Sequence, residues 1–430
     1  MGQTLDINVH HITRLEGHGN IRVRATDGKL EDCKLEIVES PRFYEAMLRG
    51  RKYTEAVHIT CRICGICSCG HTCASLRGME AALGITPSEQ TVVLRKLLLD
   101  GEFLESHVLH VFYLAVPDLL GVGSVIPLVE THRPVVEIAL RLKRLANDIC
   151  GVVAGRHIHP IAAVVNGFSK LPKLADLLPL RDRLVAARQD MAVAGGVLAT
   201  LTWPDLQRET EYISLTHPTE YALYEGTIKS SLGGELDPQN YLEWVNEYLV
   251  PHSSAKFVRS PRSQSYAVGA LARFNNNADQ LCAPAQAVAD ALGLKAPSYN
   301  PFMNNVAQVV ETIQVIETAL ERINWLEEHG IHEEDRSVKV KAGRGVGAVE
   351  VPRGILFHDY TVDAEGRIAA ANLIIPTGQN LANIEYDMRK WVPEIIHEPQ
   401  EDIRLKLEML VRAYDPCISC SCHLLDVEFV

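Results

Sequence analysis

The sequence predicts a mainly α protein with small β-sheets, an α+β fold built around a bundle of long central helices. Three observations predict it. Long segments in the middle of the 430-residue chain repeat apolar residues with the period of an amphipathic helix. Shorter segments toward both ends alternate apolar and polar residues, as half-buried strands do. The chain is 47% hydrophobic and 22% charged, which is ordinary for a globular protein and excludes a disordered or collagen-like one.

The amino-terminal part of the chain, residues 1–40, is predicted to be a β region. Apolar and polar residues alternate over 20–24. Asp27 and Gly28 then supply a hairpin turn, after which the alternation resumes.

Residues 60–335 are predicted to form a mainly helical body. One helix follows a cysteine-rich segment and ends at Gly84, and a second begins at Pro134. Residues 200–302 are richer in Pro, Ser, Asn and Tyr, so we expect long loops there. Another strong helical pattern covers 306–329.

Residues 336–430 are predicted to combine a β region with a carboxy-terminal metal-binding segment. Strands are expected over 337–376, with a turn around 363–366, and a helix over 399–413. The sequence contains no internal repeat and no clear linker. Residues 1–430 are therefore predicted to be one unit.

Charge and hydropathy exclude several classes of function. Lys and Arg number 42 against 54 Asp and Glu, so the formal net charge is −12. Without a basic run, such a chain lacks the electrostatic footprint of a nucleic-acid-binding protein. No apolar stretch reaches about 18 residues, so no membrane span is predicted. The first residues do not have the pattern of a signal peptide, and we expect a cytoplasmic protein.

The cysteines carry the strongest chemical signal. Five of the eleven lie between residues 61 and 73. A disulfide framework belongs to small secreted domains without a core, whereas this chain is long enough to bury a large one. Two Cys-x-x-Cys pairs stand out, Cys64–Cys67 and Cys417–Cys420. Four thiolates are a soft ligand set, suited to zinc, iron–sulfur iron or nickel.

Three interpretations of the two pairs are open at this point: one shared metal site, two unrelated sites, or structural thiols. In a zinc ribbon the pairs lie about 15 to 20 residues apart. Here 353 residues separate Cys64 from Cys417 (417 − 64). The entropy cost of closing a loop grows only logarithmically with its length, so this separation is allowed. A shared site would join the two ends of the fold.

The residues around both pairs resemble the signatures of nickel–iron hydrogenase large (catalytic) subunits. Six motifs match in the family's order: RLEGH at 14–18, RICGIC at 62–67 with His71, GRHIHP at 155–160, EVPRG at 350–354, PTGQN at 376–380 and DPCISCSCH at 415–423. The form PTGQN and the short chain are similar to the cytoplasmic multimeric branch, of methyl-viologen-reducing or bidirectional type. The resemblance implies that family's large-subunit fold.

The resemblance also implies a nickel–iron centre. Cys64 and Cys417 would be terminal nickel ligands, and Cys67 and Cys420 would bridge nickel to iron. The iron would hold two cyanides and one carbon monoxide, which maturation proteins must deliver. Thiolates at all four positions fit the softness of these metals.

The implied catalytic residues are Cys417, Glu16 as the first proton relay, and Arg353 poised over the metals. A carboxylate beside a thiolate can accept a proton and pass it outward. A guanidinium offers fixed donors and a positive field. The residues implied to surround the centre are His71, Pro352, Thr377 and Asp415.

A magnesium or other hard divalent ion is implied near the carboxy terminus. Its ligands would be Glu45, the carbonyl of Leu373 and His423. Magnesium prefers oxygen, so the histidine is chemically atypical. The segment LLDVEFV follows His423. Because it is apolar and short, we expect it to be docked on this chain or a partner, or to be removed during maturation.

The implied activity is the reversible heterolytic oxidation of dihydrogen to protons and electrons. The chain has no third cysteine cluster with iron–sulfur spacing. We therefore expect an obligate partner, an iron–sulfur small subunit, bound near the cysteine signatures and His159. Further electron-transfer subunits, a flavin or heterodisulfide reductase module, are also expected.

Three alternative functions compete with this one. The first is a dihydrogen-sensing regulatory homologue, and the second is a non-catalytic zinc-stabilised scaffold. The third is the related quinone-site subunit of respiratory complex I, which lacks the four cysteines that this chain has.

Some residues depart from the family pattern or lie outside its motifs. Many relatives carry an aspartate where this chain has Ser106. The cysteines predicted to be buried and without a ligand role are Cys33, Cys61, Cys69, Cys73, Cys150, Cys282 and Cys422. The histidines predicted to be polar or core residues and not ligands are His10, His11, His107, His110, His157 and His252.

Overall fold

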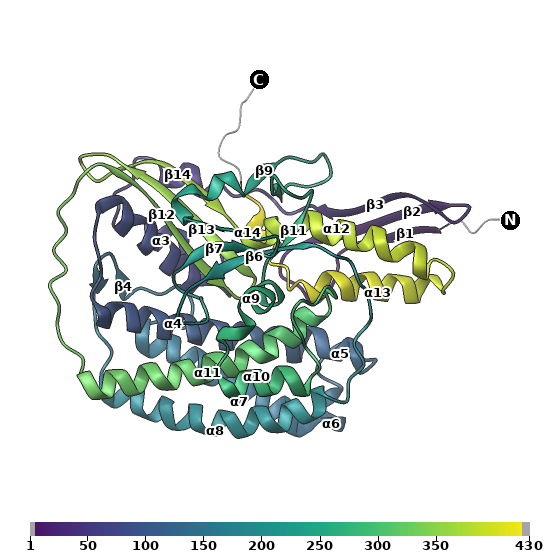
Figure 1. Cartoon of the computed structure of the whole chain (residues 1–430), viewed down its shortest axis with the longest axis horizontal. Helices are drawn as coiled ribbons and strands as arrows, with labels where there is room; N and C mark the ends of the chain where they lie inside the picture. Colours follow the sequence, from purple (N-terminus) through teal and green to yellow (C-terminus); the bar gives the residue numbers. More distant parts are fainter. Residues whose placement is uncertain (1–4, 424–430) are drawn as a thin grey trace.

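The computed structural model describes residues 5–423 of the chain (Figure 1). The segment LLDVEFV, which was predicted to be docked or removed, lies outside the described residues. The fold has a layer of long helices on one side and three- and four-stranded sheets on the other (Figure 1). The predicted α+β class is confirmed.

Four long helices lie side by side and form the helical layer, in the lower half of Figure 1. They are α4 (Glu89–Val108), α7 (Arg133–Ala154), α8 (Leu174–Leu198) and α11 (Met303–His329). Helix α4 continues as a π-helical segment, η1 (Leu109–Ala115), and a final turn, α5 (Val116–Leu119). Segments of π-helix are rare and concentrate at functional sites.

Local sequence signals set the ends of these helices as predicted. Helix α7 has Pro134 in its first turn and stops at Gly155, which adopts a left-handed φ of 80°. Helix α3 (Ser68–Leu83) follows the first cysteine pair and stops at Gly84, with φ of 66°.

The amino-terminal region is a three-stranded antiparallel sheet in the order β1-β2-β3. Its strands are β1 (Leu5–Val9), β2 (Gly19–Thr26) and β3 (Lys29–Ile37). Asp27 and Gly28 have φ of 51° and 75°, so both central residues of the β2–β3 turn are left-handed. That geometry matches the twist of the flanking strands, which is why this dipeptide predicts a hairpin.

A second three-stranded antiparallel sheet carries a deeply buried hairpin. Its strands are β12 (Gly343–Val351), β13 (Gly354–Val362) and β14 (Ile368–Ile374). Val351 pairs with Gly354, so Pro352 and Arg353 form the two-residue tip of the hairpin. The predicted turn near 363–366 joins β13 to β14, where Gly366 donates to the Asp363 carbonyl.

The segment 201–267 differs from the prediction. Residues 60–335 were expected to be mainly helical, with long loops over 200–302. The structure has short strands there instead: β6 (Glu211–Thr216), β7 (Thr227–Ser230), β8 (Glu235–Leu236), β9 (Asn246–Tyr248), β10 (Phe257–Arg259) and β11 (Tyr266–Ala267). They are two to six residues long, too short for a clear alternation, and several are buried on both faces.

The remaining elements are short or lie at the carboxy-terminal end. They are α1 (Tyr44–Leu48), α2 (Ala56–Thr60), α6 (Leu128–Thr131), β4 (Ala163–Val164), β5 (Gly167–Phe168), the 3₁₀ turns η2 (Pro238–Glu243) and η3 (Ala278–Gln280), α9 (Ala270–Asn277), α10 (Ala283–Ala291), α12 (Pro376–Ile395), α13 (Gln400–Ala413) and α14 (Ile418–Ser421). Helix α13 confirms the helix expected over 399–413. No helix within 5–423 has both the length and the apolar character to cross a membrane.

Glycines allow helix α3 to lie directly on strand β12. A Cβ atom added at Gly347 would lie 2.0 Å from the carbonyl oxygen of Ala74 and 2.5 Å from the amide nitrogen of Gly78. Backbone atoms of a packed helix cannot move aside cheaply. The two elements therefore approach each other at backbone distance, and the first cysteine pair lies directly before α3 in the core.

The first prediction concerns this contact. We expect Gly347→Ala to lower the free energy of unfolding by about 3 kcal/mol, because the new methyl group overpacks two backbones. Gly195→Ala in α8 is the matched control, since its Cβ would meet nothing within 4 Å. The urea midpoints of the two variants measure the difference. Equal midpoints would contradict the packing described here.

Candidate metal centre

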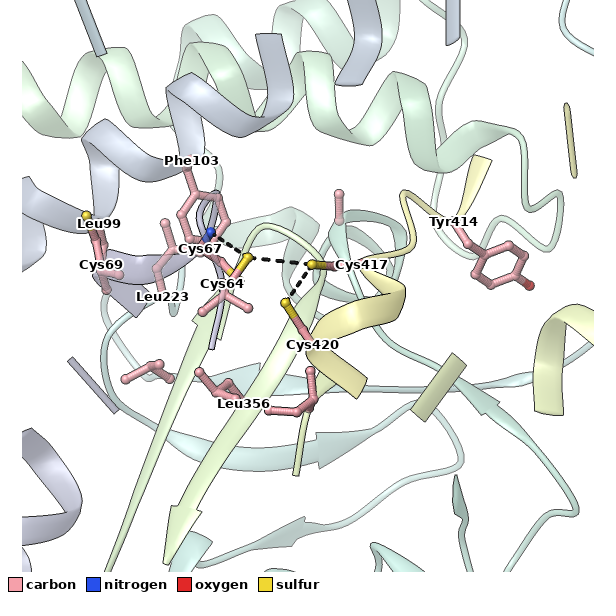
Figure 2. Packing of buried hydrophobic residues seen from close by; sticks show 14 of the residues in the cluster. Cys64, Cys67, Cys69, Leu99, Phe103, Leu223, Leu356, Tyr414, Cys417 and Cys420 are labelled. Atoms are coloured by element: carbon pink, nitrogen blue, oxygen red, sulfur yellow. Dashed lines mark hydrogen bonds between the residues drawn. The ribbon is translucent and has the colours of Figure 1, made fainter. Parts of the chain in front are cut away.

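The two cysteine pairs meet in the larger apolar core. The Cys64 and Cys417 sulfurs are 3.5 Å apart, and the Cys417 and Cys420 sulfurs are 2.7 Å apart (Figure 2). Cys67 is the residue before α3, and all four cysteines are buried. Two sulfurs bound to one metal by bonds of about 2.3 Å lie less than about 4.6 Å apart. The structure therefore brings together the four predicted ligands.

The chemistry of this cluster fits a soft metal. Cys64 Sγ accepts the amide hydrogens of Ile66 and Cys67 at 3.3 and 3.2 Å. Hydrogen bonds from the Cys417, Cys420 and Cys67 thiols hold the pKa of Cys64 well below its usual range, and the charge of Arg353 acts in the same direction. Four buried sulfurs, with donors aimed at one of them, form a thiolate site suited to nickel, iron or zinc.

The RLEGH segment holds the carboxy-terminal pair in place. The Glu16 carbonyl accepts from the Ile418 amide at 2.9 Å. A Cβ at Gly17 would lie 2.8 Å from the Ser419 nitrogen, and the φ of this residue is 85°. Only glycine fits a left-handed position with such a close backbone neighbour. The motif thus holds the segment of the second cysteine pair in place through backbone contacts with Ile418 and Ser419.

Glu16 also presents its carboxylate to the cluster. Cys417 Sγ donates to its Oε2 atom at 3.2 Å, and the Ser419 amide donates to the same oxygen at 3.0 Å. The Ser419 hydroxyl donates to Oε1. Glu16 is half-buried, whereas Cys417 is buried.

Arg42 was not identified from the sequence, although it joins the two cysteine segments. One guanidinium nitrogen, Nη2, donates to the Ile63 carbonyl at 2.9 Å and to the Ser419 carbonyl. Its backbone amide donates to the Cys422 carbonyl at 2.8 Å. No motif spacing marks this residue, because its partners are backbone carbonyls from two distant segments.

Arg353 lies at the tip of the β12–β13 hairpin, next to the sulfurs. Its Nε donates to the Asp415 carbonyl at 2.6 Å and its Nη2 to the Asp415 carboxylate at 2.7 Å. Nη1 lies 3.4 Å from the Ser106 hydroxyl. Gln308 donates to the other Asp415 oxygen at 3.0 Å. The predicted neighbours Arg353 and Asp415 therefore form one buried ion pair.

A second buried arginine fixes the hairpin tip. Arg273 on α9 donates to the carbonyls of Val351 and Pro352, each at 3.0 Å. It also pairs with Glu311 at 2.6 Å and with Glu350 at 2.8 Å. The only sequence signal for this network was Glu350 in EVPRG. The position of Arg353 thus depends on Arg273 through the backbone of the turn.

Thr377 supports the second cysteine pair from the start of α12. Its hydroxyl oxygen accepts the amide hydrogen of Cys417 at 2.9 Å. The hydroxyl hydrogen is then free to donate toward the cluster. PTGQN was predicted only as a motif, and the structure shows that it begins a helix whose first residue is Pro376.

Glu45, Leu373 and His423, the residues of the predicted hard-ion site, also lie together, with Leu373 contacting Glu45 through its amide. His423 Nδ1 lies 3.2 Å from Glu45 Oε2, and the Leu373 amide donates to Glu45 Oε1 at 3.0 Å. Burial raises the pKa of Glu45, but His423 and the Leu373 amide outweigh it and the pKa is lowered. Apart from this contact with each other, Glu45 Oε2 and His423 Nδ1 have no hydrogen-bond partner within residues 5–423. A buried carboxylate oxygen and a buried imidazole nitrogen at this separation can both bind one cation.

The other cysteines and histidines mostly lie where they were predicted. Cys61, Cys69, Cys73, Cys33, Cys150 and Cys422 are buried. Cys282 was predicted to be core but is only half-buried, because it stands where a loop enters α10. His107 bonds Glu311 at 2.7 Å, His110 bonds Gln308 at 2.5 Å and His252 bonds Glu385 at 2.7 Å. His10, His11 and His157 are exposed.

Comparison with known proteins identifies the family. The family described as "Nickel-dependent hydrogenase" matches residues 42–133 and 180–423, and one described as "HoxL-like" matches residues 6–40. The chain belongs to the nickel-dependent hydrogenase family. The two matches of the larger family include both cysteine pairs, so the four-sulfur cluster of this hydrogenase lies in the region that defines the family.

Relatives cover nearly the whole hydrogenase chain. The alpha subunit of sulfhydrogenase 1 from Pyrococcus furiosus is 35% identical, covering 98% of each chain. The vhc F420-non-reducing hydrogenase of Methanococcus voltae has a subunit that is 29% identical, covering 98% of this chain and 96% of that one. These proteins are hydrogenase subunits, and the predicted class of enzyme, an oxidoreductase acting on dihydrogen as a catalytic large subunit, is confirmed.

Solved structures share the fold. An NAD+-reducing [NiFe]-hydrogenase in its H2-reduced state superposes with a TM-score of 0.87 at 26% identity, covering 97% of this chain and 99% of that one. A [NiFeSe]-hydrogenase of Dm. baculatum gives a TM-score of 0.77 at 22% identity, which shows the fold alone. The large-subunit fold implied by the motifs is confirmed, and a nickel–iron site follows from the family together with the sulfur cluster.

The second prediction tests the arginine network that places Arg353. Burial raises the pKa of Glu311, but Arg273 and His107 outweigh burial and hold the pKa at about 2. A carboxyl whose pKa is lowered on folding contributes stability above its unfolded pKa of about 4.3, and that stability is lost as the pH falls toward 2. We therefore expect Glu311→Gln to destabilise the chain more at pH 7 than at pH 3.

Urea midpoints of wild type and Glu311→Gln at the two pH values measure this effect. The half-exposed pair Arg141–Asp190 offers the matched control, since Asp190→Asn removes an ion pair with water access. We expect Asp190→Asn to change the midpoint little at either pH. A destabilisation by Glu311→Gln that is the same at pH 7 and pH 3 would contradict the ion-pair account.

Proposed function

We propose that this hydrogenase oxidises dihydrogen reversibly at a nickel–iron centre held by Cys64, Cys67, Cys417 and Cys420. Cys64 and Cys417 would be terminal nickel ligands, and Cys67 and Cys420 would bridge to iron. The observation that carries the proposal is the convergence of the four buried sulfurs in the core of the fold. When bound, the centre, with two cyanides and one carbon monoxide on iron, would supply the two-electron acceptor for heterolytic cleavage of dihydrogen.

Arg353 and Thr377 would orient groups at the open side of the site. Arg353 is fully buried and lies within electrostatic range of Cys417, Cys67 and Cys64. Asp415 fixes the guanidinium through two hydrogen bonds, so its donors point in one direction without reorganisation. The Thr377 hydroxyl, anchored by the Cys417 amide, is placed to donate to a second anionic group.

Glu16 would carry the proton away from the site. Its Oε2 atom lies within hydrogen-bond distance of Cys417 Sγ, which is the geometry a proton relay needs. Ser419 holds the carboxylate by its amide and hydroxyl, so the acceptor is already oriented. The half-buried position of Glu16 lets the proton leave the core in one step.

Glu45, the Leu373 carbonyl and His423 would hold a magnesium or similar ion. Glu45 Oε2 and His423 Nδ1, two buried atoms that contact each other and no other hydrogen-bonding group within residues 5–423, support a cation there. Oxygen ligands and waters would complete its coordination. Such an ion would fix the residues after Cys420 without touching the reacting groups.

An iron–sulfur small subunit would bind over the first cysteine pair and receive the electrons. The relatives are named as single subunits of hydrogenases, so they act within larger assemblies. His159 Nδ1 bonds the Cys61 carbonyl at 2.9 Å, and next to it Ile158 and Ile161 are 45% and 48% exposed. Exposed apolar side chains beside the cysteines are typical of an interface. We also propose that flavin or heterodisulfide reductase subunits accept the electrons, that maturation proteins assemble the centre, and that the protein is cytoplasmic.

The third prediction tests the metal ligands. Elemental analysis of the purified complex should find nickel and iron, and infrared spectra should show bands of the diatomic ligands. Cys64→Ser and Cys417→Ser should lose nickel, because a neutral hydroxyl is a poor ligand for a soft metal. Cys73→Ser is the matched control, since this buried thiol lies outside the cluster. Zinc alone at the site would overturn the proposal in favour of a scaffold.

The fourth prediction tests the proton relay. Glu16→Gln should remove most dihydrogen uptake with an artificial acceptor while nickel and iron stay bound, because an amide keeps the shape but cannot ionise. Glu36→Gln on β3, an acid in a loose pair with Arg22 at 3.8 Å, is the control and should keep wild-type turnover. Turnover by Glu16→Gln at the wild-type rate would exclude Glu16 as the relay. Negligible turnover by wild type would favour a dihydrogen sensor.

A further inference from the structure

A buried carboxylate after the π-helical segment joins two segments of the proposed site. Asp118 lies in α5, the turn that directly follows η1, and its side chain is 4% exposed. Arg14 Nη2 and Arg412 Nη2 both donate to its Oδ1 atom, the latter at 3.2 Å. Arg412 Nε donates to Oδ2 at 2.8 Å. These three residues form what we call the Asp118 cluster, and the mechanism proposed above uses none of them.

The two arginines belong to the segments that carry the proton donor and the proton acceptor. Arg14 lies in RLEGH, two residues before Glu16. Arg412 lies in the last turn of α13, five residues before Cys417. Helix α13 packs against η1, and α13 and α5 lie at the same end of the fold (Figure 1). The cluster therefore holds together the two segments between which the proton has to pass.

Contacts with the amino-terminal segment flank Cys417 on both sides. Before it in the sequence, Arg412 Nη1 donates to the Thr13 carbonyl at 2.9 Å. After it, the Ser419 amide donates to Glu16 Oε2 at 3.0 Å. The attachment at Ser419 alone would leave the preceding residues free to tilt about it. The second attachment fixes the position of Cys417 relative to Glu16.

Both segments have backbone conformations that depend on support from their surroundings. Arg14 and Asp415 have φ of 59° and 50°, in the left-handed region that is unfavourable for residues other than glycine. Arg14 Nη1 donates to the Leu114 carbonyl at 2.8 Å, and His110 Nε2 donates to the Arg412 carbonyl at 2.7 Å. Leu114 and His110 both lie in η1. The π-helical segment thus supports both arginines through its own residues as well.

The arrangement of charges makes the cluster depend on Asp118. Arg412 is buried, and both arginines donate to the same carboxylate oxygen. Two guanidinium groups this close repel each other once the negative charge between them is removed. Glu408 pairs with Arg412 at 3.1 Å, but Asp118 is the carboxylate that contacts both arginines. Loss of its charge would therefore push the two segments apart where they meet.

We propose that Asp118 is a positioning residue for the proton transfer from Cys417 to Glu16. By holding Arg14 and Arg412 on one carboxylate, it sets the distance of 3.2 Å between Cys417 Sγ and Glu16 Oε2. The inference rests on the proposed function of Glu16 as the relay. The proton alone moves, leaving a thiolate on Cys417 and a carboxylic acid on Glu16. Direct transfer needs a separation of at most about 3.2 Å, and a misplacement of about 1 Å can cost about a hundredfold in rate.

The test is dihydrogen uptake by the intact complex with an artificial acceptor, measured in H2O and in D2O. Asp118→Asn keeps the shape of the side chain but removes its charge. It should lower kcat about tenfold with nickel and iron still bound, because the displaced donor and acceptor transfer the proton more slowly. The solvent isotope effect on kcat should rise, since proton transfer then limits turnover. A merely structural defect would lower the active fraction without changing the isotope effect.

Asp100→Asn is the matched control. Asp100 is also a buried carboxylate, with a side chain that is 1% exposed, and it pairs with Arg322 on α11. This variant should keep the wild-type kcat and isotope effect. A change in Asp100→Asn equal to that in Asp118→Asn would show a general effect of losing a buried ion pair and would overturn the inference.

A double-mutant cycle shows whether Asp118 acts through Glu16. The relay is absent from Glu16→Gln, so adding Asp118→Asn should lower the residual turnover by less than about twofold. A further tenfold loss in that background would show that Asp118 acts independently of Glu16, which contradicts the inference.

The Glu16→Gln variant also separates this inference from the proposed function. Wild-type turnover by Glu16→Gln would overturn the proposed relay and this inference with it. Loss of turnover in Glu16→Gln, together with a wild-type kcat and isotope effect in Asp118→Asn, would overturn this inference alone.

Arg14→Lys decides if Asp118→Asn does not fold or does not bind nickel. Lysine keeps the charge, but its single ammonium group lacks the fork that contacts both Leu114 and Asp118. Its kcat should fall and its isotope effect should rise, each by less than expected for Asp118→Asn. Unchanged values in Arg14→Lys would overturn the inference. Loss of nickel there as well would show that the cluster holds the metal ligands and not the relay, and would also overturn it.

Discussion

Four buried sulfurs drawn from opposite ends of the chain have to be held within a few ångströms of one another. Cys64 and Cys417 are 353 residues apart in sequence, yet their sulfurs are 3.5 Å apart. Thiolates repel each other and lose solvation when buried, so the segment that carries the second pair needs independent anchors. The structure supplies them from the amino-terminal third of the chain, through the backbone of Glu16 and both the guanidinium and the amide of Arg42.

The same requirement explains the buried charges around the cluster. Arg353 pairs with Asp415, and Arg273 pairs with Glu311 and Glu350, all within the core. A buried ion pair contributes little net stability, but removing one partner is costly. These pairs therefore specify one arrangement of the hairpin tip and of the second cysteine pair. The Arg353 guanidinium itself lies within electrostatic range of the sulfurs of Cys417, Cys67 and Cys64.

Local signals explain how much of the fold the sequence could predict. Asp27–Gly28, Pro134 and Gly84 act within a few residues, and each lies where its turn or helix end was expected. The strands over 211–267 were missed because each is too short and too buried to show alternation. The start of α12 was not predicted as a helix. Its second residue, Thr377, contacts the backbone of Cys417, and a contact with so distant a segment leaves no local helix signal.

The residues of the candidate site also fall into two groups, those that the sequence predicts and those that only the structure reveals. The spacing of the cysteine pairs indicates metal binding, so these residues could be predicted from the sequence alone. Glu45 and His423 came from the resemblance alone, since nothing local links them. Arg42 and Arg273 act through backbone carbonyls of distant segments. Such residues become visible only when the packing is known.

The most direct test of the central claim is X-ray absorption at the nickel edge of the purified complex. The account predicts a first shell of sulfur atoms, four per nickel, at the bond length of about 2.3 Å that metal–thiolate bonds have. Iron should appear as a neighbour beyond that shell. A first shell of nitrogen or oxygen atoms, or fewer than four sulfurs per nickel, would contradict the claim that the two ends of the chain share one thiolate site.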